Sequence, residues 1–270
     1  MKKRRFITAV LVLILLVSAA QVGWKIYESV QRAQEYEEAA QTAGLTQEPS
    51  APTPAPPEAP APSGQAPIPG EAEALAAVDL AALQAVNPDV AGWIEIPGTE
   101  VSYPILYGED NELYLNHTWT GESNSGGSIF LECTASRDLS DFHTIVYGHR
   151  MRDESMFGSI KHYNDPDYYA AHPNVYTVAD GILSQWQIFS ARETGVRELT
   201  YRLDLEESGL EEAFVQDCLD HSVIDTGVLP GEGARFLTLS TCTGRGYATR
   251  WVVHAALLET WPVSAQGEGR

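Results

Sequence analysis

A run of nineteen residues without a charge, Phe6 to Trp24, limits what this chain can fold into more than any other feature. At a rise of about 1.5 Å per residue, a helix of that length just crosses a hydrocarbon core of about 30 Å. The basic residues Lys2 to Arg5 precede the run and favour a cytoplasmic amino terminus. The sequence therefore predicts a cytoplasmic segment at 1–5, a single transmembrane signal-anchor at 6–24 in the cell membrane, and an extracellular remainder.

A cleaved signal peptide is the competing interpretation of this run. Ser18-Ala19-Ala20 resembles a small-residue cleavage site. We favour a retained anchor because the apolar run is longer than a usual signal core. It also ends near Trp24 and Tyr27, whose rings suit the membrane interface. Both interpretations export the rest of the chain.

Two segments of different composition follow the apolar run. Residues 25–43 are rich in Gln, Glu and Ala, which predicts an exposed juxtamembrane helix that continues from the membrane. Residues 44–70 hold nearly all their apolar content as Ala and Pro, so they prefer extended polyproline geometry and cannot bury a core. We expect 44–70 to be a linker that lifts a folded domain off the membrane.

The residues after this linker carry the whole negative charge of the chain. Residues 1–70 contain six Lys/Arg and six Asp/Glu, whereas the later residues contain eleven and thirty-one, which leaves a net charge of -20. A surface that acidic repels phosphate backbones, so we expect no nucleic-acid partner. The simplest role for the charge is solubility.

The sequence predicts a folded domain at 71–262 and a tail at 263–270. The pattern of residues in this domain is typical of a mainly β protein. Short runs rich in β-branched and aromatic residues alternate with Gly, Pro, Asn and Asp. About eight strands with few helices favour a closed barrel or a sandwich. The predicted strands are 90–96, 101–106, 127–131, 144–147, 174–178, 184–191, 235–239 and 250–258.

Helical spacing is confined to two places in this domain. In 71–86, Leu75, Val78, Ala82 and Val86 recur at helical spacing, and Asn87-Pro88 ends the pattern.

The second predicted helix spans 208–222. Ser208 and Glu211 form a capping box there, and Cys218 lies on the apolar face, which predicts that it fills the core.

Three cysteines are too few and too scattered for a disulfide scaffold or a CxxC zinc site. Cys133 either fills the core or pairs with Cys218, so at least one thiol has no intrachain partner. A free thiol is liable to oxidation outside the cell, and catalysis is one reason to keep it. Cys242, where the strand 235–239 gives way to a Gly-rich loop, is the candidate nucleophile.

A thiol nucleophile needs a partner that takes its proton and a group that stabilises the oxyanion formed on attack. His149 follows directly on the predicted strand 144–147. Arg250 comes eight residues after Cys242, a spacing that fits a short loop and a return along the neighbouring strand. Histidines near strand ends are common, so spacing by itself makes these two residues candidates only.

The exported domain resembles class B sortases over about residues 80 to 258. Thr238-Leu239-Ser240-Thr241-Cys242 is similar to the TLxTC signature of sortases. Tyr147-Gly148-His149-Arg150-Met151, followed by Ser155-Met156-Phe157-Gly158, resembles the class B YGHxM and SMFG stretch. Arg250-Trp251-Val252-Val253-His254-Ala255 resembles the Arg-x-Val-Val-His-Ala strand. Upstream stretches, from Asn87-Pro88 to Gly127–Leu131, match that class in the same order.

The resemblance implies a closed eight-stranded sortase-type β-barrel with an N-terminal helix and one helix before the cysteine strand. It implies that Cys242 attacks the carbonyl of a Thr in a sorting signal. His149 would protonate the leaving amine and later accept a proton from the incoming one, and Arg250 would bind the substrate carbonyl or the oxyanion. Positions that match the class B substrate groove are Asn111, Leu115, Tyr147, Ser240 and Thr241.

The remaining candidate residues receive simpler interpretations. Arg245, in the loop between Cys242 and Arg250, is a second arginine that could contact substrate. His254 matches a structural position of the family. No HxxxH motif or acidic cluster supports a metal, and no cofactor is expected. The other histidines are expected at the surface or in loops: His117, His143, His162, His172 and His221.

The implied activity is that of a cysteine transpeptidase. It would cleave a sorting signal after Thr, through a thioester on Cys242, and transfer the protein to a peptidoglycan amine. The implied substrates are secreted proteins with a C-terminal NPxTN or PPxTG-like signal. The alternatives are a pilin-polymerising sortase, a simple cysteine peptidase that hydrolyses the same bond, and an inactive surface binding protein.

Overall fold

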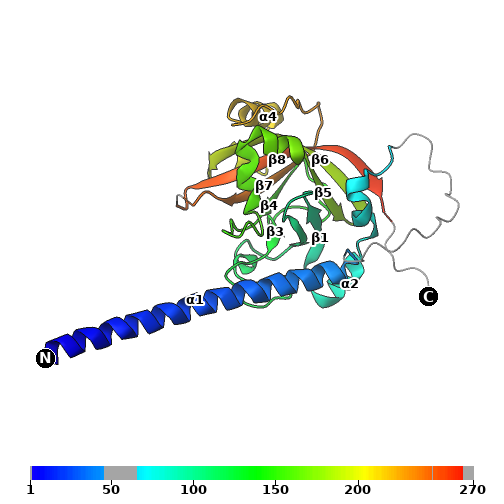
Figure 1. Ribbon diagram of the computed structural model, residues 1–270. Helices are drawn as coiled ribbons and strands as arrows, with labels where there is room; N and C mark the ends of the chain where they lie inside the picture. The colour runs from blue at the N-terminus through cyan, green and yellow to red at the C-terminus, as the bar shows by residue number, and fades with distance from the viewer. Residues whose placement is uncertain (1, 46–65, 245, 264–270) are drawn as a thin grey trace, which may run out of the picture.

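The computed structural model describes residues 2–45, 66–244 and 246–263 (Figure 1). Eight strands close into a barrel in the order β1-β2-β3-β4-β7-β8-β6-β5, which confirms the predicted fold class. The pairs β2·β3 and β4·β7 run parallel and the other neighbours run antiparallel. The strands are β1 (Val90–Glu95), β2 (Ser102–Leu106), β3 (Ile129–Leu131), β4 (His143–Tyr147), β5 (Asn174–Ala179), β6 (Ile182–Gly195), β7 (Phe236–Cys242) and β8 (Thr249–Pro262).

One long helix and several short ones connect or cover the strands. The α-helices are α1 (Lys2–Thr42), α2 (Leu80–Val86), α3 (Pro166–Ala171) and α4 (Glu211–Asp220), and the 3-10 helices are η1 (Gly70–Ala77), η2 (Leu113–Leu115), η3 (Ser159–Asn164) and η4 (Leu199–Tyr201). Figure 1 places α4 and α1 on opposite sides of the barrel.

The strand β7, which carries the candidate nucleophile, is buried on both of its faces. Every residue from Phe236 to Thr241 is buried, although alternate side chains point to opposite faces of a strand. A second core cluster outside the barrel covers one face, where Phe214 and Cys218 of α4 pack against Phe236. Cys218 therefore fills the core, as predicted.

The predicted helix over 71–86 is two helices. The chain is extended at Val78, with φ -58° and ψ 122°, and the Asp79 side chain accepts a hydrogen bond from the Ala82 amide at 2.9 Å. Asp79 thereby caps a new helix, because its side chain satisfies an amide that a continuous helix would pair internally. As a result Val86 is 54 % exposed and does not continue the buried face.

The predicted capping box at Ser208 and Glu211 is wrong. The helix α4 begins at Glu211, and no side chain caps it. Ser208 donates its hydroxyl hydrogen to the Asp204 carboxylate at 2.7 Å instead. Gly209, at φ 62°, turns the chain between Ser208 and the helix, so the serine side chain is directed elsewhere.

The helix α1 is continuous through the apolar run and well beyond it. An 18-residue window within it has a mean hydropathy of 2.4, and none of that window is buried in the protein. This helix is long and apolar enough to cross a membrane, which is compatible with an anchor or a signal sequence. Most of the predicted linker, residues 46–65, lies outside the described residues.

The segment 25–43 is not an exposed helix as expected. Arg32, Tyr36, Ala39 and Ala43 are all buried. They recur at intervals of three or four residues and so form one stripe along the helix, and the two alanines allow the barrel to approach closely. This part of α1 therefore packs on the barrel.

Two buried histidines contact the same threonine of β7. His143 on β4 and His254 on β8 lie 2.7 and 2.8 Å from the Thr238 hydroxyl of β7, which lies between them. The surface position expected for His143 is wrong: this residue is the first of a strand covered by Phe214 of α4. His254 is fully buried and structural, as the family resemblance implies.

This pair predicts a loss of stability in mild acid. Burial lowers the pKa of His143 from its ordinary 6.5 to about 4, and burial lowers the pKa of His254 as well. Between pH 6.5 and about 4, His143 binds a proton in the unfolded chain but not in the folded one. The free energy of unfolding therefore falls as the pH drops through this range. At 1.36 kcal/mol per pKa unit, His143 accounts for about 3 kcal/mol of that loss.

The free energy of unfolding, measured in urea from pH 7 to pH 4.5, tests this expectation. His143→Gln replaces the imidazole with an amide, which can bond Thr238 and does not titrate in this range. The variant should lose less stability with acid than the wild type. An identical pH dependence in both proteins would contradict the assignment to His143.

Candidate active site

Cys242 and Arg250 face each other across two neighbouring strands. Cys242 is the last residue of β7, three residues beyond the predicted strand end, and it pairs directly with Arg250 on β8. Directly opposed residues of an antiparallel pair project their side chains from the same face. Both residues are half-buried, so the thiol and the guanidinium lie on one partly open side of the sheet.

His149 reaches the same place from β4, the other neighbour of β7. Tyr147 pairs with Ser240 in the parallel register, and the Gly148 amide continues the ladder with a 3.1 Å hydrogen bond to the Ser240 carbonyl. Thr241 donates its hydroxyl hydrogen to the Gly148 carbonyl at 2.7 Å. The structure therefore holds His149 beside the end of β7, where Cys242 lies.

The imidazole of His149 has a defined hydrogen-bond partner. Its Nε2 lies 2.6 Å from the carbonyl oxygen of Leu115. A carbonyl oxygen can only accept, so Nε2 carries a hydrogen in this arrangement. The histidine is contacted by the backbone of Leu115, a residue that is 42 % exposed.

Arg250 is held by the loop that follows Cys242. Its Nη1 donates to the carbonyl oxygens of Tyr247 and Thr249 at 2.9 and 3.0 Å. Arg150, next to His149, donates to the Thr243 carbonyl of the same loop. Arg245 lies outside the described residues.

Tyr201 is a residue of this region that no sequence motif marks. It comes from η4, after β6, and its hydroxyl lies 2.7 Å from that of Ser240. The pKa of Tyr201 is raised to about 12, mainly by burial and also by Cys242, against the hydrogen bond with Ser240 and the charge of Arg250, which both lower it. The tyrosine therefore lies within electrostatic reach of both the thiol and the guanidinium.

Asn111 and Tyr147 are joined by a buried carboxylate, Glu132. Its Oε1 accepts a hydrogen bond from Asn111 Nδ2 at 2.7 Å, and its Oε2 accepts one from the Tyr147 hydroxyl at 2.8 Å. Burial and the negative charge of Glu132 raise the pKa of Tyr147. The only signal in the sequence for Glu132 is an acidic residue directly after the buried strand β3.

Ser240 and Thr241 differ in what their side chains do. Both are buried, and neighbouring residues of a strand point to opposite faces. Ser240 lies on the face of Cys242 and contacts Tyr201. Thr241 points the other way and binds the segment before His149.

The other two cysteines are free, so Cys133 and Cys218 are not paired. Burial raises the pKa of Cys218 to about 12. Burial and the Glu132 carboxylate raise the pKa of Cys133. Neither environment favours a thiolate, which is the nucleophilic form. Within the described residues, no group of three or more His, Cys, Asp and Glu side chains could hold a metal ion.

The family model described as Sortase domain matches residues 94–258, more than half of the chain and all three of Cys242, His149 and Arg250. The chain belongs to the sortase family. It is 35% identical over 165 residues to sortase B of Listeria monocytogenes, a match that covers 61% of this chain and 67% of that protein.

Solved structures of sortase B have the same fold as this chain. The Staphylococcus aureus sortase B–substrate complex has a TM-score of 0.69 and 25% identity, and the match covers 86% of this chain and 99% of that one. Sortase B from B. anthracis in complex with AAEK1 has a TM-score of 0.65 and 27% identity, over 87% and 99% of the two chains. The resemblance to class B is therefore confirmed, and family membership supports a transpeptidase enzyme.

Proposed function

We propose that this chain is a class B sortase that acts as a cysteine transpeptidase at the cell surface. It cleaves a sorting signal after Thr and transfers the protein to a peptidoglycan precursor amine. The observation that carries the proposal is the pairing of Cys242 with Arg250, with His149 held at the adjacent strand end. The S. aureus sortase B structure with its substrate supports a sorting signal as the ligand class.

Each of the three residues has a role that its place in the structure permits. The Cys242 thiolate attacks the Thr carbonyl carbon, and the oxyanion that forms is stabilised by the cationic Arg250 across the strand pair. Collapse of this intermediate expels the amine, which takes a proton from His149, and leaves a thioester. The incoming amine then attacks the thioester, gives a proton to His149 and releases the thiolate.

The proposed location is the cell membrane, with residues 1–5 in the cytoplasm and the barrel outside. The apolar, unburied half of α1 supports a single-pass anchor at 6–24. The proposed substrates are secreted proteins with a C-terminal NPxTN or PPxTG-like signal, which reach the same face of the membrane.

A peptide assay with and without an amine acceptor tests this function. The full-length protein, in detergent, is incubated with NPxTN and PPxTG-like peptides, and the products are identified by mass spectrometry. We expect an amine-linked product that appears only with acceptor. Hydrolysis alone would favour the simple peptidase, and a preference for a pilin lysine would favour the polymerising sortase. The absence of any acyl-enzyme would favour the binding protein.

Glu132→Ala should weaken substrate binding more than chemistry. The variant frees Asn111 and Tyr147, two residues of the proposed groove, and leaves the Asn111 amide and the Tyr147 hydroxyl, both half-buried, without this partner. We expect kcat/KM to fall about tenfold, mainly through KM, since tenfold corresponds to about 1.4 kcal/mol. Peptide-cleavage kinetics measure the change.

Glu132→Gln is the matched control for this prediction. Its amide oxygen can accept from Asn111 while its NH2 donates to the Tyr147 hydroxyl, so it should retain most of the wild-type KM. An unchanged KM in Glu132→Ala would show that the network does not position the groove.

A further inference from the structure

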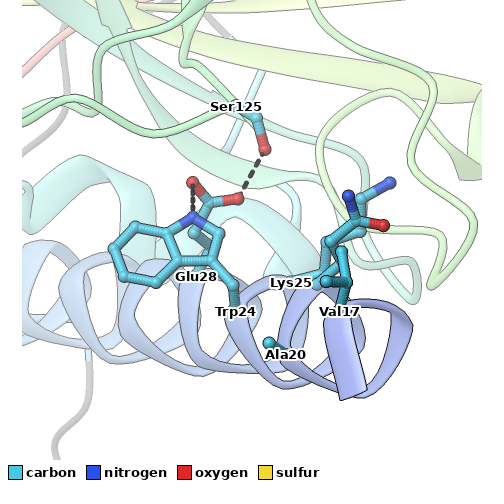
Figure 2. Close-up of a pocket in the computed structure, with 7 residues that line it drawn as sticks. Val17, Ala20, Trp24, Lys25, Glu28 and Ser125 are labelled. Carbon is cyan, nitrogen blue, oxygen red and sulfur yellow. Dashed lines mark hydrogen bonds between the residues drawn. The ribbon is translucent and has the colours of Figure 1, made fainter. Parts of the chain in front are cut away.

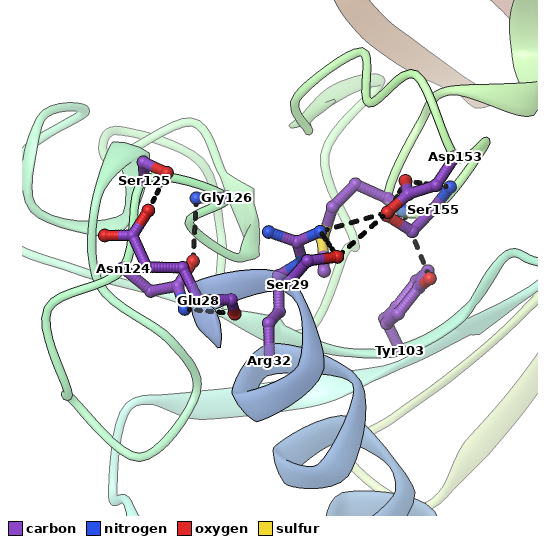
Figure 3. Close-up of polar contacts among 10 residues, drawn as sticks. Glu28, Ser29, Arg32, Tyr103, Asn124, Ser125, Gly126, Asp153 and Ser155 are labelled. Carbon is purple, nitrogen blue, oxygen red and sulfur yellow. Dashed lines mark hydrogen bonds and ion pairs between the residues drawn. The ribbon is translucent and has the colours of Figure 1, made fainter. Parts of the chain in front are cut away.

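The juxtamembrane half of α1 contacts both chain segments that flank His149. One is the turn 150–157, which follows the histidine, and the other is the loop 113–128, which contains Leu115. Figure 3 shows side chains of α1 reaching toward both segments. Because the proposed mechanism depends on where the His149 imidazole lies, contacts that fix these two segments bear on catalysis.

Arg32 anchors the turn that follows His149. Its guanidinium is almost fully buried and lies 3.2 Å from the Asp153 carboxylate (Figure 3). Asp153 in turn accepts hydrogen bonds from the hydroxyl and amide of Ser155, at 2.6 and 3.2 Å. The turn closes back on the histidine, since the Phe157 amide donates to the His149 carbonyl at 3.0 Å.

Tyr36 anchors the other segment. Its hydroxyl lies 2.9 Å from the Gly127 carbonyl and 3.0 Å from Ser128 Oγ. Ser128 connects Tyr36 to the segment before Leu115, because the Ser128 amide donates a hydrogen bond to the Tyr114 carbonyl at 2.9 Å. The next residue, Leu115, supplies the carbonyl oxygen that binds His149 Nε2.

Arg32 fits its site closely. A Cβ atom at position 126 would overlap the Arg32 side chain, so this side chain packs directly against Gly126 and would have to shift for a larger residue there (Figure 3). Burying an arginine costs several kcal/mol unless it is paired. The ion pair with Asp153 offsets that cost, so a buried and paired charge binds this part of α1 to the turn that follows His149.

We propose that α1 is a positioning element of the active site, in which Arg32 and Tyr36 together fix the imidazole of His149 relative to Cys242. This inference rests on the proposed function, in which His149 transfers protons. Arg32 sets the backbone on the carboxyl side of the histidine, and Tyr36 sets the carbonyl that its Nε2 binds. The helix that carries both residues is continuous with the apolar segment at 6–24. The proposed membrane anchor and the residues that position His149 are therefore parts of one helix.

The test uses the full-length protein in detergent, with Arg32→Met, Tyr36→Phe and the double variant. Methionine keeps much of the arginine volume without a charge, and phenylalanine removes one oxygen only. We expect the double variant to lose about tenfold to 100-fold in kcat, the size of effect of a displaced catalytic group, with KM little changed. Arg32→Lys retains the cation and should recover part of the loss.

A second readout does not depend on the sorting signal. Alkylation of Cys242 by iodoacetamide is followed by peptide mass mapping across pH, with Cys133 in the same protein as an internal reference. The variants should shift the pH dependence of alkylation at Cys242 and leave that of Cys133 unchanged. The two proposals can fail separately. If the wild type forms no amine-linked product but the variants still shift the pH dependence of Cys242 alkylation, the proposed function is wrong and the positioning role of α1 is retained.

Glu38→Ala is the matched control on the same helix. Glu28 is unsuitable because its carboxylate accepts a hydrogen bond from Ser125 of the loop 113–128 at 3.0 Å (Figure 2), whereas Glu38 is exposed and its loss should change neither readout. Wild-type kcat and alkylation profile in the double variant would overturn the inference. If Arg32→Met fails to fold, Tyr36→Phe alone decides: a shifted alkylation profile supports the proposal, and an unchanged one overturns it.

Discussion

Cys242→Ala will abolish both cleavage of a sorting-signal peptide and the covalent adduct between peptide and protein. Without the sulfur no thioester can form, and Arg250 and His149 have no nucleophile to assist. We expect the rate to fall by about 10⁴-fold or more, the range found when a nucleophile that acts as a unit with its partners is removed. Chromatography of the peptide measures cleavage, and intact mass spectrometry of the protein measures the adduct.

Cys133→Ala is the control for this result. Cys133 is also a free, half-buried thiol, but burial and Glu132 raise its pKa and so disfavour the thiolate. Its removal should leave the adduct and the cleavage rate near those of the wild type. Continued cleavage by Cys242→Ala would rule out the covalent mechanism proposed for this chain.

His149→Ala and Arg250→Ala will each slow transpeptidation by orders of magnitude while the barrel stays folded. Both residues are half-buried at strand ends, so truncating them removes little packing. Loss of a general acid–base group costs about 10²–10⁴-fold, and loss of an oxyanion donor about 10²–10³-fold. Single-turnover kinetics with a thioester-forming peptide separate the two steps in which His149 moves a proton.

Arg245→Ala distinguishes the two arginines near Cys242. Arg250 pairs with Cys242 across β7 and β8, so its loss should be far more damaging than that of Arg245. If Arg245→Ala proved the more damaging variant, the oxyanion role would pass to that residue. Thermal unfolding of each variant checks that the kinetic effects do not arise from unfolding.

The barrel strands could be predicted from the sequence to within a few residues, apart from the outer ends of the two long strands. Runs such as Phe236 to Leu239 are recognisable as strands in the sequence, because β-branched and aromatic residues suit a pleated, buried surface. The ends of β6 and β8 could not be predicted, since the two strands pair with each other from Ile182–Pro262 to Gly195–Thr249. Only the partner strand shows how far such a ladder extends.

Local patterns failed where a distant side chain or a turn competed with them. Ser208 matched a capping box, but Asp204 takes its hydroxyl. The helical spacing from Leu75 to Val86 was interrupted by Asp79, whose side chain starts a helix of its own. His143 was expected at the surface or in a loop, but in the folded chain it contacts Thr238 of the neighbouring strand and Phe214 of α4 and is buried.

The sequence by itself predicted the apolar helix, the acidic domain and the candidate residues Cys242, His149 and Arg250. These follow from hydrophobic runs, charge and short motifs, which adjacent residues specify. The tertiary structure alone decided that Glu132 joins Asn111 to Tyr147, and that Arg32 and Tyr36 of α1 bind the segments around His149. Such contacts join residues far apart in the chain, and their energy arises from burial and pairing that exist only once the barrel has closed.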